Sequence, residues 1–261
     1  MPLLFFDFVP CRLCLTLLRN GRLDDHAPQT LSLPWTLHVQ LAALALAHRR
    51  DGSVRHLLFS LGDLKSGATS RPDASGVRSA DVTIDASCGL WARIFSPSPA
   101  TNADAEPAPV PVVVYFHGGS PRRTMTALRH TTMAYDDGVV ALRYLDANAD
   151  SLPVAHVPVD LSSCLLAGDS AGGNITHHVS QRWAAASVSA SLPVNLRIAG
   201  AILIQPFFGG EEQTTAEVAL DGVSALSVSG TDHYWREFLP DGATRDHEAA
   251  RLCGEGVELA D

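Results

Sequence analysis

The stretch LLAGDSAGGN, residues 165–174, decides the fold because it joins an apolar run directly to a helical pattern. Its centre, Gly168-Asp169-Ser170-Ala171-Gly172, is a G-x-S-x-G sequence, which is typical of a nucleophile elbow when a strand precedes it and a helix follows. In such a turn the serine has a strained backbone, and a bulkier residue at either glycine position would clash with the adjacent strand or helix. The turn lifts the serine hydroxyl clear of the sheet.

Ser170 is therefore the candidate nucleophile. The helix that begins after it offers free N–H groups and a positive dipole end to an oxyanion, and we expect the N–H of Ala171 to be one donor. The alternative is a Gly-Ser-Gly turn that serves flexibility alone. The apolar strand before Ser170 and the amphipathic helix after it favour the nucleophile.

A second glycine turn precedes the first by about fifty residues. The sequence YFHGGS, residues 115–120, ends a buried apolar run in His117-Gly118-Gly119. Glycines there let backbone N–H groups approach a substrate carbonyl oxygen, so Gly118 and Gly119 are the other candidate oxyanion donors. The alternative is a plain strand-to-loop turn that needs positive φ. We expect His117 to orient this loop and not to act as a base.

The surrounding pattern predicts an α/β fold with a mostly parallel sheet covered on both faces. Residues 81–86 and 90–97 alternate apolar and polar side chains, as half-buried antiparallel strands do. Three apolar runs suit central strands: 112–119, 163–170 and 198–208. Helical spacing appears at 34–50, 134–149 and 172–186, and strands that alternate with helices imply the parallel sheet.

Composition bounds the possible functions. The chain has 261 residues, of which 46% are apolar and 18% charged, enough to bury a sizeable core. The net charge of −9 and the lack of a Lys/Arg-rich stripe exclude a nucleic-acid surface. Five scattered cysteines do not form a disulfide framework, and Cys11-x-x-Cys14 lacks the second pair that a structural zinc site needs.

The N-terminal stretch MPLLFFDFVPCRLCLTLL is apolar but does not have the pattern of a signal peptide. It lacks a basic start, Asp7, Pro10 and Arg12 interrupt it, and it is too short to cross a bilayer. We therefore expect a soluble protein of the cytoplasm, with the nucleus as a second location, and no membrane partner.

Several motifs together resemble one family. They are His117-Gly118-Gly119, AYDDGVVALRYL (134–145), GDSAGGN (168–174) and ILIQPFFGGEE (202–212), with LPWTLHVQL (33–41) and TDHYWREFLPDGATRDHEAA (231–250) beside them. From about residue 33 onward the chain resembles the plant carboxylesterases of the hormone-sensitive-lipase-like group of α/β-hydrolases. The same group contains the gibberellin receptors, which bind a hormone and hydrolyse no ester.

The resemblance implies a Ser-Asp-His triad in which the acid follows the seventh strand and the histidine follows the eighth. The sequence ends at Asp261, before either motif, so Ser170 is the only triad member that matches. His177 and His178 are poor substitutes, because a rise of ~1.5 Å per residue places their backbones ~10–12 Å from Ser170. We expect them to face solvent or a partner element.

Other nearby groups are also poor candidates for the missing acid and base. Adjacent residues rarely aim as acid and base at one point, which argues against Asp232-His233 and Asp246-His247. These pairs resemble cap or loop positions of the family. The side chain of Asp169 is expected to point away from the oxyanion face.

A second departure from the family lies after the glycine turn. Relatives have a third glycine, a helix and an interior strand before AYDDG, whereas here SPRRTMTALRHTTM (120–133) contains no strand pattern and begins with Ser120. Losing an interior strand would leave two buried edges with unpaired N–H and C=O groups. Either the coding sequence has been joined incompletely, or this relative no longer folds as a hydrolase.

The sequence thus predicts an α/β-hydrolase fold lacking one central strand and the C-terminal strands. Residues 1–78 form an N-terminal arm and helical lid, and residues 79–261 form the incomplete hydrolase domain. The resemblance implies hydrolysis of a small carboxylic ester through Ser170 without cofactor or metal, with weak or no turnover in this chain. The alternative is a non-catalytic protein that binds an apolar acid under the lid.

Overall fold

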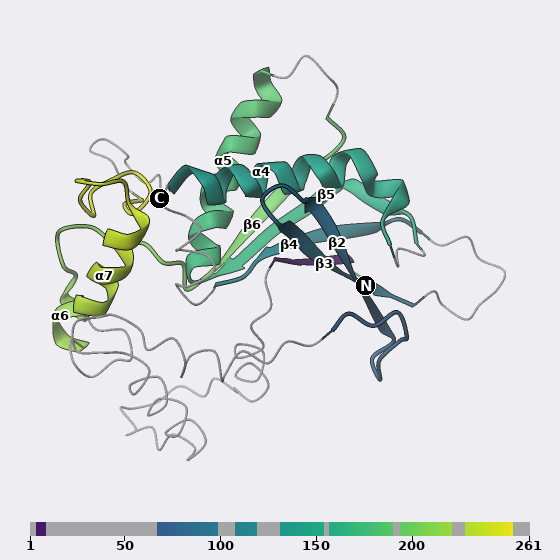
Figure 1. Ribbon diagram of the computed structural model, residues 1–261, viewed down its shortest axis with the longest axis horizontal. Helices are drawn as coiled ribbons and strands as arrows, with labels where there is room; N and C mark the ends of the chain where they lie inside the picture. Colours follow the sequence, from purple (N-terminus) through teal and green to yellow (C-terminus); the bar gives the residue numbers. More distant parts are fainter. Residues whose placement is uncertain are drawn as a thin grey trace.

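A six-stranded β-sheet forms the centre of the molecule, with its strands in the order β2-β3-β1-β4-β5-β6 (Figure 1). The structure is a computed structural model, and it describes residues 4–8, 67–98, 108–118, 131–153, 157–189, 194–220 and 228–252. The predicted helical lid at 34–50, the Cys11-x-x-Cys14 pair and Gly119 lie outside these ranges.

The first edge of the sheet is an antiparallel hairpin. Strand β2 (Val77–Asp85) pairs with β3 (Leu90–Pro97), as the alternating pattern predicted. Between them, Asp85 Oδ1 accepts a hydrogen bond of 2.8 Å from the N–H of Ser87, and Gly89 closes the turn at a φ of 73°. Across the pair, Arg93 Nε donates to Asp81 Oδ1 at 2.6 Å, which fixes the register of the two strands.

The other half of the sheet is parallel. Strands β4 (Val110–Phe116), β5 (Val159–Asp169) and β6 (Ile198–Ile204) lie side by side with their carboxyl ends at one edge. The apolar runs of the sequence predicted all three. Strand β6 stops at Ile204, four residues short of the apolar run, because Gln205 turns away at a φ of 44°. Among the described strands, β6 is the second edge of the sheet.

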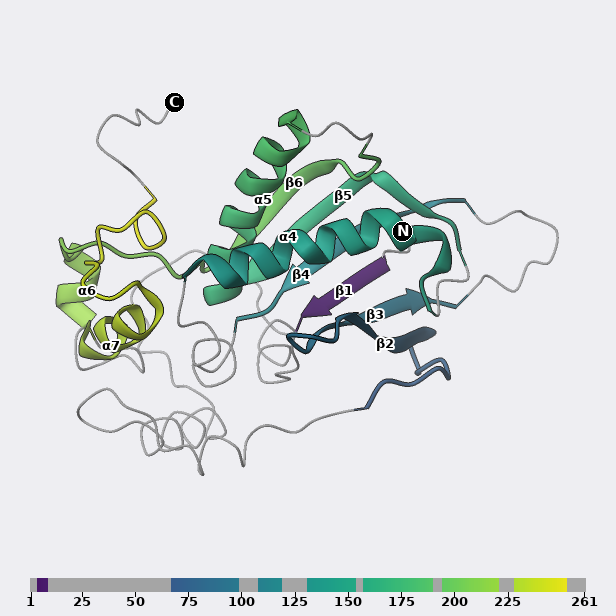
Figure 2. The same cartoon turned by 45° about the horizontal axis from the view of Figure 1, so that its top comes forward.

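The interior gap that the sequence predicted is filled from the N-terminus. Strand β1 (Leu4–Phe8) lies between the hairpin and the parallel half, antiparallel to β3 and parallel to β4 (Figure 2). The register pairs Leu4 with Val112 and Phe8 with Phe116. The two interior edges are therefore paired along this stretch, and Leu4–Phe8 belong to the sheet and not to an arm. Residues 119–130, which include most of the stretch in which the sequence showed no strand pattern, lie outside the described ranges.

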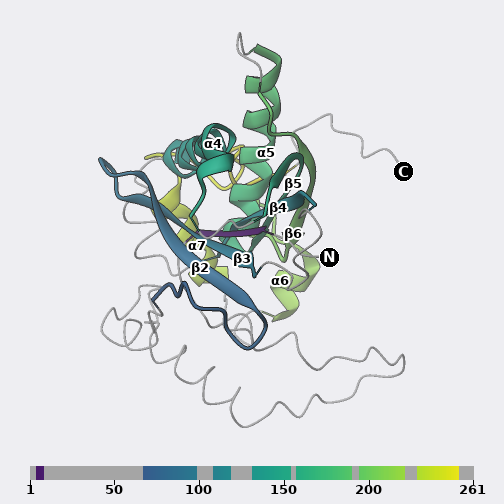
Figure 3. The same ribbon diagram turned by 90° about the vertical axis from the view of Figure 1, so that its right-hand side faces the viewer.

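Two long helices cover one face of the sheet. Helices α4 (Thr131–Asn148) and α5 (Ala171–Ser189) lie on the same side of the strands in every view (Figure 3). They approach closely at Gly138, where a Cβ would collide with Val179 and touch the ring of Phe116. The residues they bury with the sheet form one core, which includes Ile94, Val112, Val114, Phe116, Leu142, Leu145, Leu166, Val179 and Leu196.

The remaining elements pack beyond the carboxyl ends of the parallel strands. They are the short helix α6 (Thr215–Leu220), helix α7 (Val228–Phe238) and the turns that follow α7; a single 3-10 turn, η1 (Ala149–Ser151), extends α4. Phe207 stacks on Trp235 with ring centroids 4.7 Å apart, and the N–H of Gly209 donates to the carbonyl of Ala250 at 2.8 Å. The loop after β6 therefore anchors this segment to the sheet.

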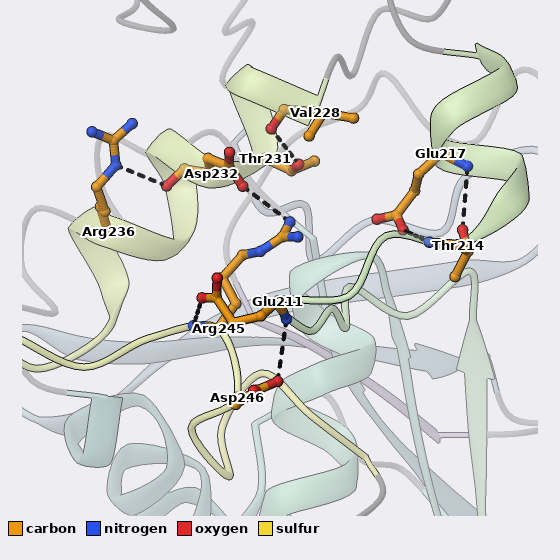
Figure 4. Close-up of polar contacts among 9 residues, drawn as sticks. All are labelled: Glu211, Thr214, Glu217, Val228, Thr231, Asp232, Arg236, Arg245 and Asp246. Carbon is orange, nitrogen blue, oxygen red and sulfur yellow. Dashed lines mark hydrogen bonds and ion pairs between the residues drawn. The ribbon is translucent and has the colours of Figure 1, made fainter.

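A network of polar contacts holds the segment together (Figure 4). Thr214 and Glu217 cap α6 reciprocally: Thr214 Oγ1 accepts from the N–H of Glu217, and Glu217 Oε2 accepts from the N–H of Thr214 at 2.7 Å. Arg245 pairs with Asp232 of α7 at 3.0 Å. None of the described helices is both long enough and apolar enough to span a membrane.

Candidate functional site

Ser170 occupies the junction between β5 and α5 in a left-handed backbone conformation. Its φ of 51° is unusual for a residue with a side chain and confirms the predicted strain. Backbone hydrogen bonds hold it there: its N–H donates to the carbonyl of Ile204 at 3.0 Å, and its carbonyl accepts from the N–H of Phe207 at 2.8 Å. The end of β6 therefore fixes the turn from one side.

The glycines on either side of Ser170 are required by close packing. A Cβ on Gly172 would overlap the carbonyl oxygen of Phe116 at the end of β4. A Cβ on Gly168 would overlap the carbonyl oxygen of Gly172 one turn later. Strand β4, the end of β5 and the start of α5 thus meet with no room for a side chain, as the sequence predicted.

Ala171 is the first residue of α5. A residue in this position has no acceptor within its own helix, because helical N–H groups bond to a carbonyl four residues earlier. Its N–H lies at the positive end of the helix dipole, next to the nucleophile. This placement suits the predicted oxyanion donor, although the role itself stays a prediction.

The His117-Gly118 turn lies directly against Ser170. A Cβ built on Gly118 would stand 3.0 Å from Ser170 Cβ and 2.5 Å from the carbonyl oxygen of Asp169. The two glycine-bearing turns therefore converge, as the motif order predicted. Gly119, the other donor predicted for this turn, lies outside the described ranges.

The N–H of Gly118 already has a partner. It donates to Asp169 Oδ1 at 2.7 Å, and the hydroxyl of Tyr115 donates to the same oxygen at 2.7 Å. Asp169 therefore points toward the glycine turn and not away from it, which corrects the expectation for this side chain. Gly118 can donate to an oxyanion only after the carboxylate releases its N–H.

His117 is half-buried, and its Nε2 atom is buried with no hydrogen-bond partner among the residues that the structure describes. A buried, unpaired imidazole nitrogen is a cost to stability. The described contacts give this nitrogen no bond with which to orient the loop, so the orienting role of His117 stays a prediction.

His177 and His178 face partner elements. His178 stacks on Tyr135 of α4 with ring centroids 4.4 Å apart, and His177 meets the ring of Phe208 edge-on at 5.5 Å. Burial lowers the pKa of both imidazoles, that of His178 to about 4, with the neighbouring His177 adding to the effect on His178. Among the described residues, neither histidine hydrogen-bonds Ser170, and both face partner elements, as predicted.

The two Asp-His pairs after α6 have structural partners. Asp232 pairs with Arg245, and Asp246 accepts from the N–H of Glu211 at 3.2 Å (Figure 4). Asp246 also pairs with Arg251. His247 Nδ1 accepts from the N–H of Ala249 at 3.1 Å. Asp246-His247 lies in the turns after α7, as predicted, whereas Asp232-His233 lies inside helix α7 and not in a cap or loop, which corrects that expectation. The described part of the chain therefore places no base against the Ser170 hydroxyl.

Sequence reasoning missed Tyr115 as part of this site. The feature of the sequence that could have identified Tyr115 is the alternation of side chains between the two faces along neighbouring parallel strands. Tyr115 pairs with Ala167, and Asp169 lies two residues beyond Ala167 on the same face of β5. The pattern could therefore have placed both side chains on the face opposite α5.

Within the described ranges, no group of three His, Cys, Asp or Glu side chains forms a candidate metal site.

Comparison with known proteins gives a consistent result. The alpha/beta hydrolase fold family matches residues 127–260. Gibberellin receptor GID1C of Arabidopsis thaliana is 34% identical over 245 residues, which cover 81% of this chain and 69% of the receptor. Carboxylesterase 20 of the same plant is 31% identical, over 87% of this chain and 77% of the relative.

Other relatives are covered less fully. Probable carboxylesterase 6 of Arabidopsis thaliana is 34% identical, and the match spans 60% of its length. Among solved structures, the ester-hydrolase EH1AB1 from the metagenome of Lake Arreo, in complex with a bipyridine phosphonate derivative, superposes with a TM-score of 0.50. It is 20% identical over 82% of this chain and 72% of its own, a likeness that concerns the fold alone.

Proposed function

The chain belongs to the α/β-hydrolase fold family, together with plant carboxylesterases and gibberellin receptors, and we propose that its Ser170 site hydrolyses small carboxylic esters. The observation that carries this proposal is the strained φ of 51° at Ser170, next to the glycine turn and at the start of α5. Strain of this kind is retained where the surrounding structure holds a side chain for function.

The chemistry follows from this arrangement. The Ser170 oxygen attacks the ester carbonyl, and the oxygen that becomes negative is stabilised by the N–H of Ala171 and by that of Gly119, the second donor predicted for the glycine turn, while the N–H of Gly118 stays on Asp169. Collapse of this intermediate breaks the bond to the alcohol, which takes up, by way of water, the proton that the Ser170 hydroxyl loses, and an acyl group remains on Ser170. Water then hydrolyses the acyl-enzyme, so the net reaction needs no metal or organic cofactor.

Turnover in this chain should be slow. The proton of the Ser170 hydroxyl needs a base, and the described residues place none within hydrogen-bond reach of it. A serine hydrolase without its base retains only what binding and the oxyanion donors supply. We therefore expect rates above the uncatalysed reaction but far below those of a complete triad.

Hydrolysis of p-nitrophenyl acetate tests the proposal. The chain is compared with Ser170→Ala and with Ser162→Ala, an exposed serine at the other end of β5. We expect Ser170→Ala to lose the activity above background and Ser162→Ala to retain it. Equal rates for the wild-type chain and Ser170→Ala would overturn the proposal.

Binding without catalysis is the second candidate function. The observation in its favour is that no described histidine hydrogen-bonds Ser170, and the relatives include gibberellin receptors. A gibberellin-type acid should then raise the melting temperature of the wild-type chain and of Ser170→Ala equally. A ligand-induced shift with no Ser170-dependent hydrolysis would favour binding, and the reverse result would favour the esterase.

A further inference from the structure

We propose that Asp169 is a positioning residue whose carboxylate, shared by the hydroxyl of Tyr115 and the N–H of Gly118, seats the His117-Gly118 turn against Ser170. The claim that Asp169 affects catalysis rests on the proposed function. The claim that Asp169 holds the His117-Gly118 turn in place rests on contacts among described residues alone. The two can therefore be tested separately.

The strand register brings Tyr115 and Asp169 to the same face of the sheet. In the parallel β4–β5 pair, Tyr115 lies opposite Ala167, and successive side chains alternate between faces. Asp169 is two residues beyond Ala167 and shares its face. The 2.7 Å bond from Tyr115 Oη to Asp169 Oδ1 is the diagonal contact that this register permits.

The same carboxylate oxygen reaches past the end of β4. Strand β4 ends at Phe116, so pairing with the neighbouring strands does not fix the position of Gly118. The bond of 2.7 Å from its N–H to Asp169 Oδ1 supplies that connection. A hydrogen bond to an ionised carboxylate is about twice as strong as one between neutral groups. It is therefore well suited to hold a turn that lies outside the sheet.

The backbone at Gly118 is closely packed against its neighbours. A Cβ there would lie 2.7 Å from Asp169 Oδ2 and 3.0 Å from Ser170 Cβ, so the backbone of the turn lies against both residues. Asp169 and Ser170 are consecutive, and a shift of the carboxylate moves the turn relative to the nucleophile. Asp169 thus acts through the Gly118 turn and not on the ester itself.

Four variants separate positioning from a general effect on folding. Asp169→Ala removes the acceptor, whereas Asp169→Asn keeps an acceptor oxygen at the same place without the charge. Tyr115→Phe removes one donor and leaves the bond to Gly118. Asp160→Ala is the matched control, because Asp160 is at the opposite end of β5 and, within the described part of the chain, its carboxylate accepts hydrogen bonds from Ser162 alone.

The first readout is hydrogen exchange of the Gly118 amide, measured by NMR on the full chain. We expect Asp169→Ala to accelerate this exchange at least tenfold while the amides of the central strands stay protected. Asp169→Asn should fall between Asp169→Ala and the wild-type chain, and Asp160→Ala should match the wild type. Unchanged exchange at Gly118 in Asp169→Ala would overturn the proposal, as would loss of protection spread evenly over the sheet.

The second readout is the hydrolysis of p-nitrophenyl acetate. Asp169→Ala should lower kcat at least tenfold with a smaller change in KM, and Asp169→Asn should recover part of the loss. Full activity in Asp169→Ala would overturn the catalytic part of the proposal. If the wild-type chain and Ser170→Ala hydrolyse the ester equally, the proposed function fails, and the exchange of the Gly118 amide still decides whether Asp169 positions the turn.

Discussion

The carbonyl oxygen of Phe116 occupies the space where a Cβ on Gly172 would stand. This contact joins the end of β4 to the first turn of α5 and places the His117-Gly118 turn beside Ser170. The geometry of the candidate site therefore depends on the absence of a side chain at Gly172 as much as on the serine.

Replacing Gly172 by alanine should destabilise the fold by about 3 kcal/mol, because α5 must move away from β4 to admit the methyl group. Gly200→Ala is the matched control in β6, where a Cβ would make an ordinary contact of 3.4 Å with Leu165. It should change the free energy of unfolding by less than about 1 kcal/mol. Urea denaturation measures both, and equal effects would contradict the close packing described here.

The strain at Ser170 predicts a difference between two inactive variants. Glycine adopts a φ of 51° freely, whereas alanine retains the cost of the left-handed conformation. We expect Ser170→Gly to be more stable than Ser170→Ala by about 1 kcal/mol in chemical denaturation. Should Ser170→Ala be the more stable of the two, the left-handed conformation at this position would not be a source of strain.

Strand β1 predicts that a few N-terminal residues are essential for stability. Deleting residues 1–8 would remove the pairing of β1 with β3 and β4 and leave two interior edges with unpaired backbone groups. We expect loss of the cooperative thermal transition, or a fall in Tm of more than about 10 °C. Deleting residues 1–3 alone keeps Leu4–Phe8 and should leave the transition nearly unchanged. Similar melting of both truncated chains would show that the sheet does not depend on β1.

The burial of His178 predicts that the folded chain loses stability on acidification. Burial against Tyr135 lowers its pKa to about 4, whereas an unfolded chain has an ordinary imidazole with a pKa near 6.5. Between these values the unfolded state binds more protons, so the free energy of unfolding falls as the pH drops from about 6.5 to about 4. Because the ring is only partly buried, we expect His178 to contribute about 1 kcal/mol of this fall.

His178→Phe checks this prediction, since phenylalanine keeps the stacking on Tyr135 and cannot take up a proton. Denaturation curves at several pH values should show a shallower decline between pH 6.5 and pH 4 for the variant than for the wild-type chain. Parallel declines would assign the pH dependence to other groups.

The parts of the fold that the sequence predicted correctly are those set by local pattern. The apolar runs around Val113 and Leu166 marked two parallel strands because a strand buried on both faces needs apolar side chains throughout. The run around Ile202 also marked a strand, but its predicted central place is wrong: among the described strands β6 lies at the edge, and the Ile202 side chain is 49% exposed. The G-x-S-x-G sequence predicted the strain at Ser170 because its backbone requirement lies within five residues.

Two features were missed because they depend on contacts between distant parts of the chain. Strand β1 pairs with residues 112–116, more than a hundred positions away, and no local periodicity encodes that pairing. The direction of Asp169 depends on the register between β4 and β5, which is set by the whole sheet. The sequence shows that a carboxylate lies next to the nucleophile, but it does not show which backbone N–H donates a hydrogen bond to that carboxylate.

The central claim is that the converging turns expose one reactive serine at position 170. Incubation of the folded chain with a p-nitrophenyl phosphonate, followed by peptide mapping by mass spectrometry, tests it most directly. We predict a single covalent adduct on the peptide that contains Ser170, and no adduct on Ser170→Ala. A folded wild-type chain that stays unlabelled, or labelling that persists in Ser170→Ala, would contradict it.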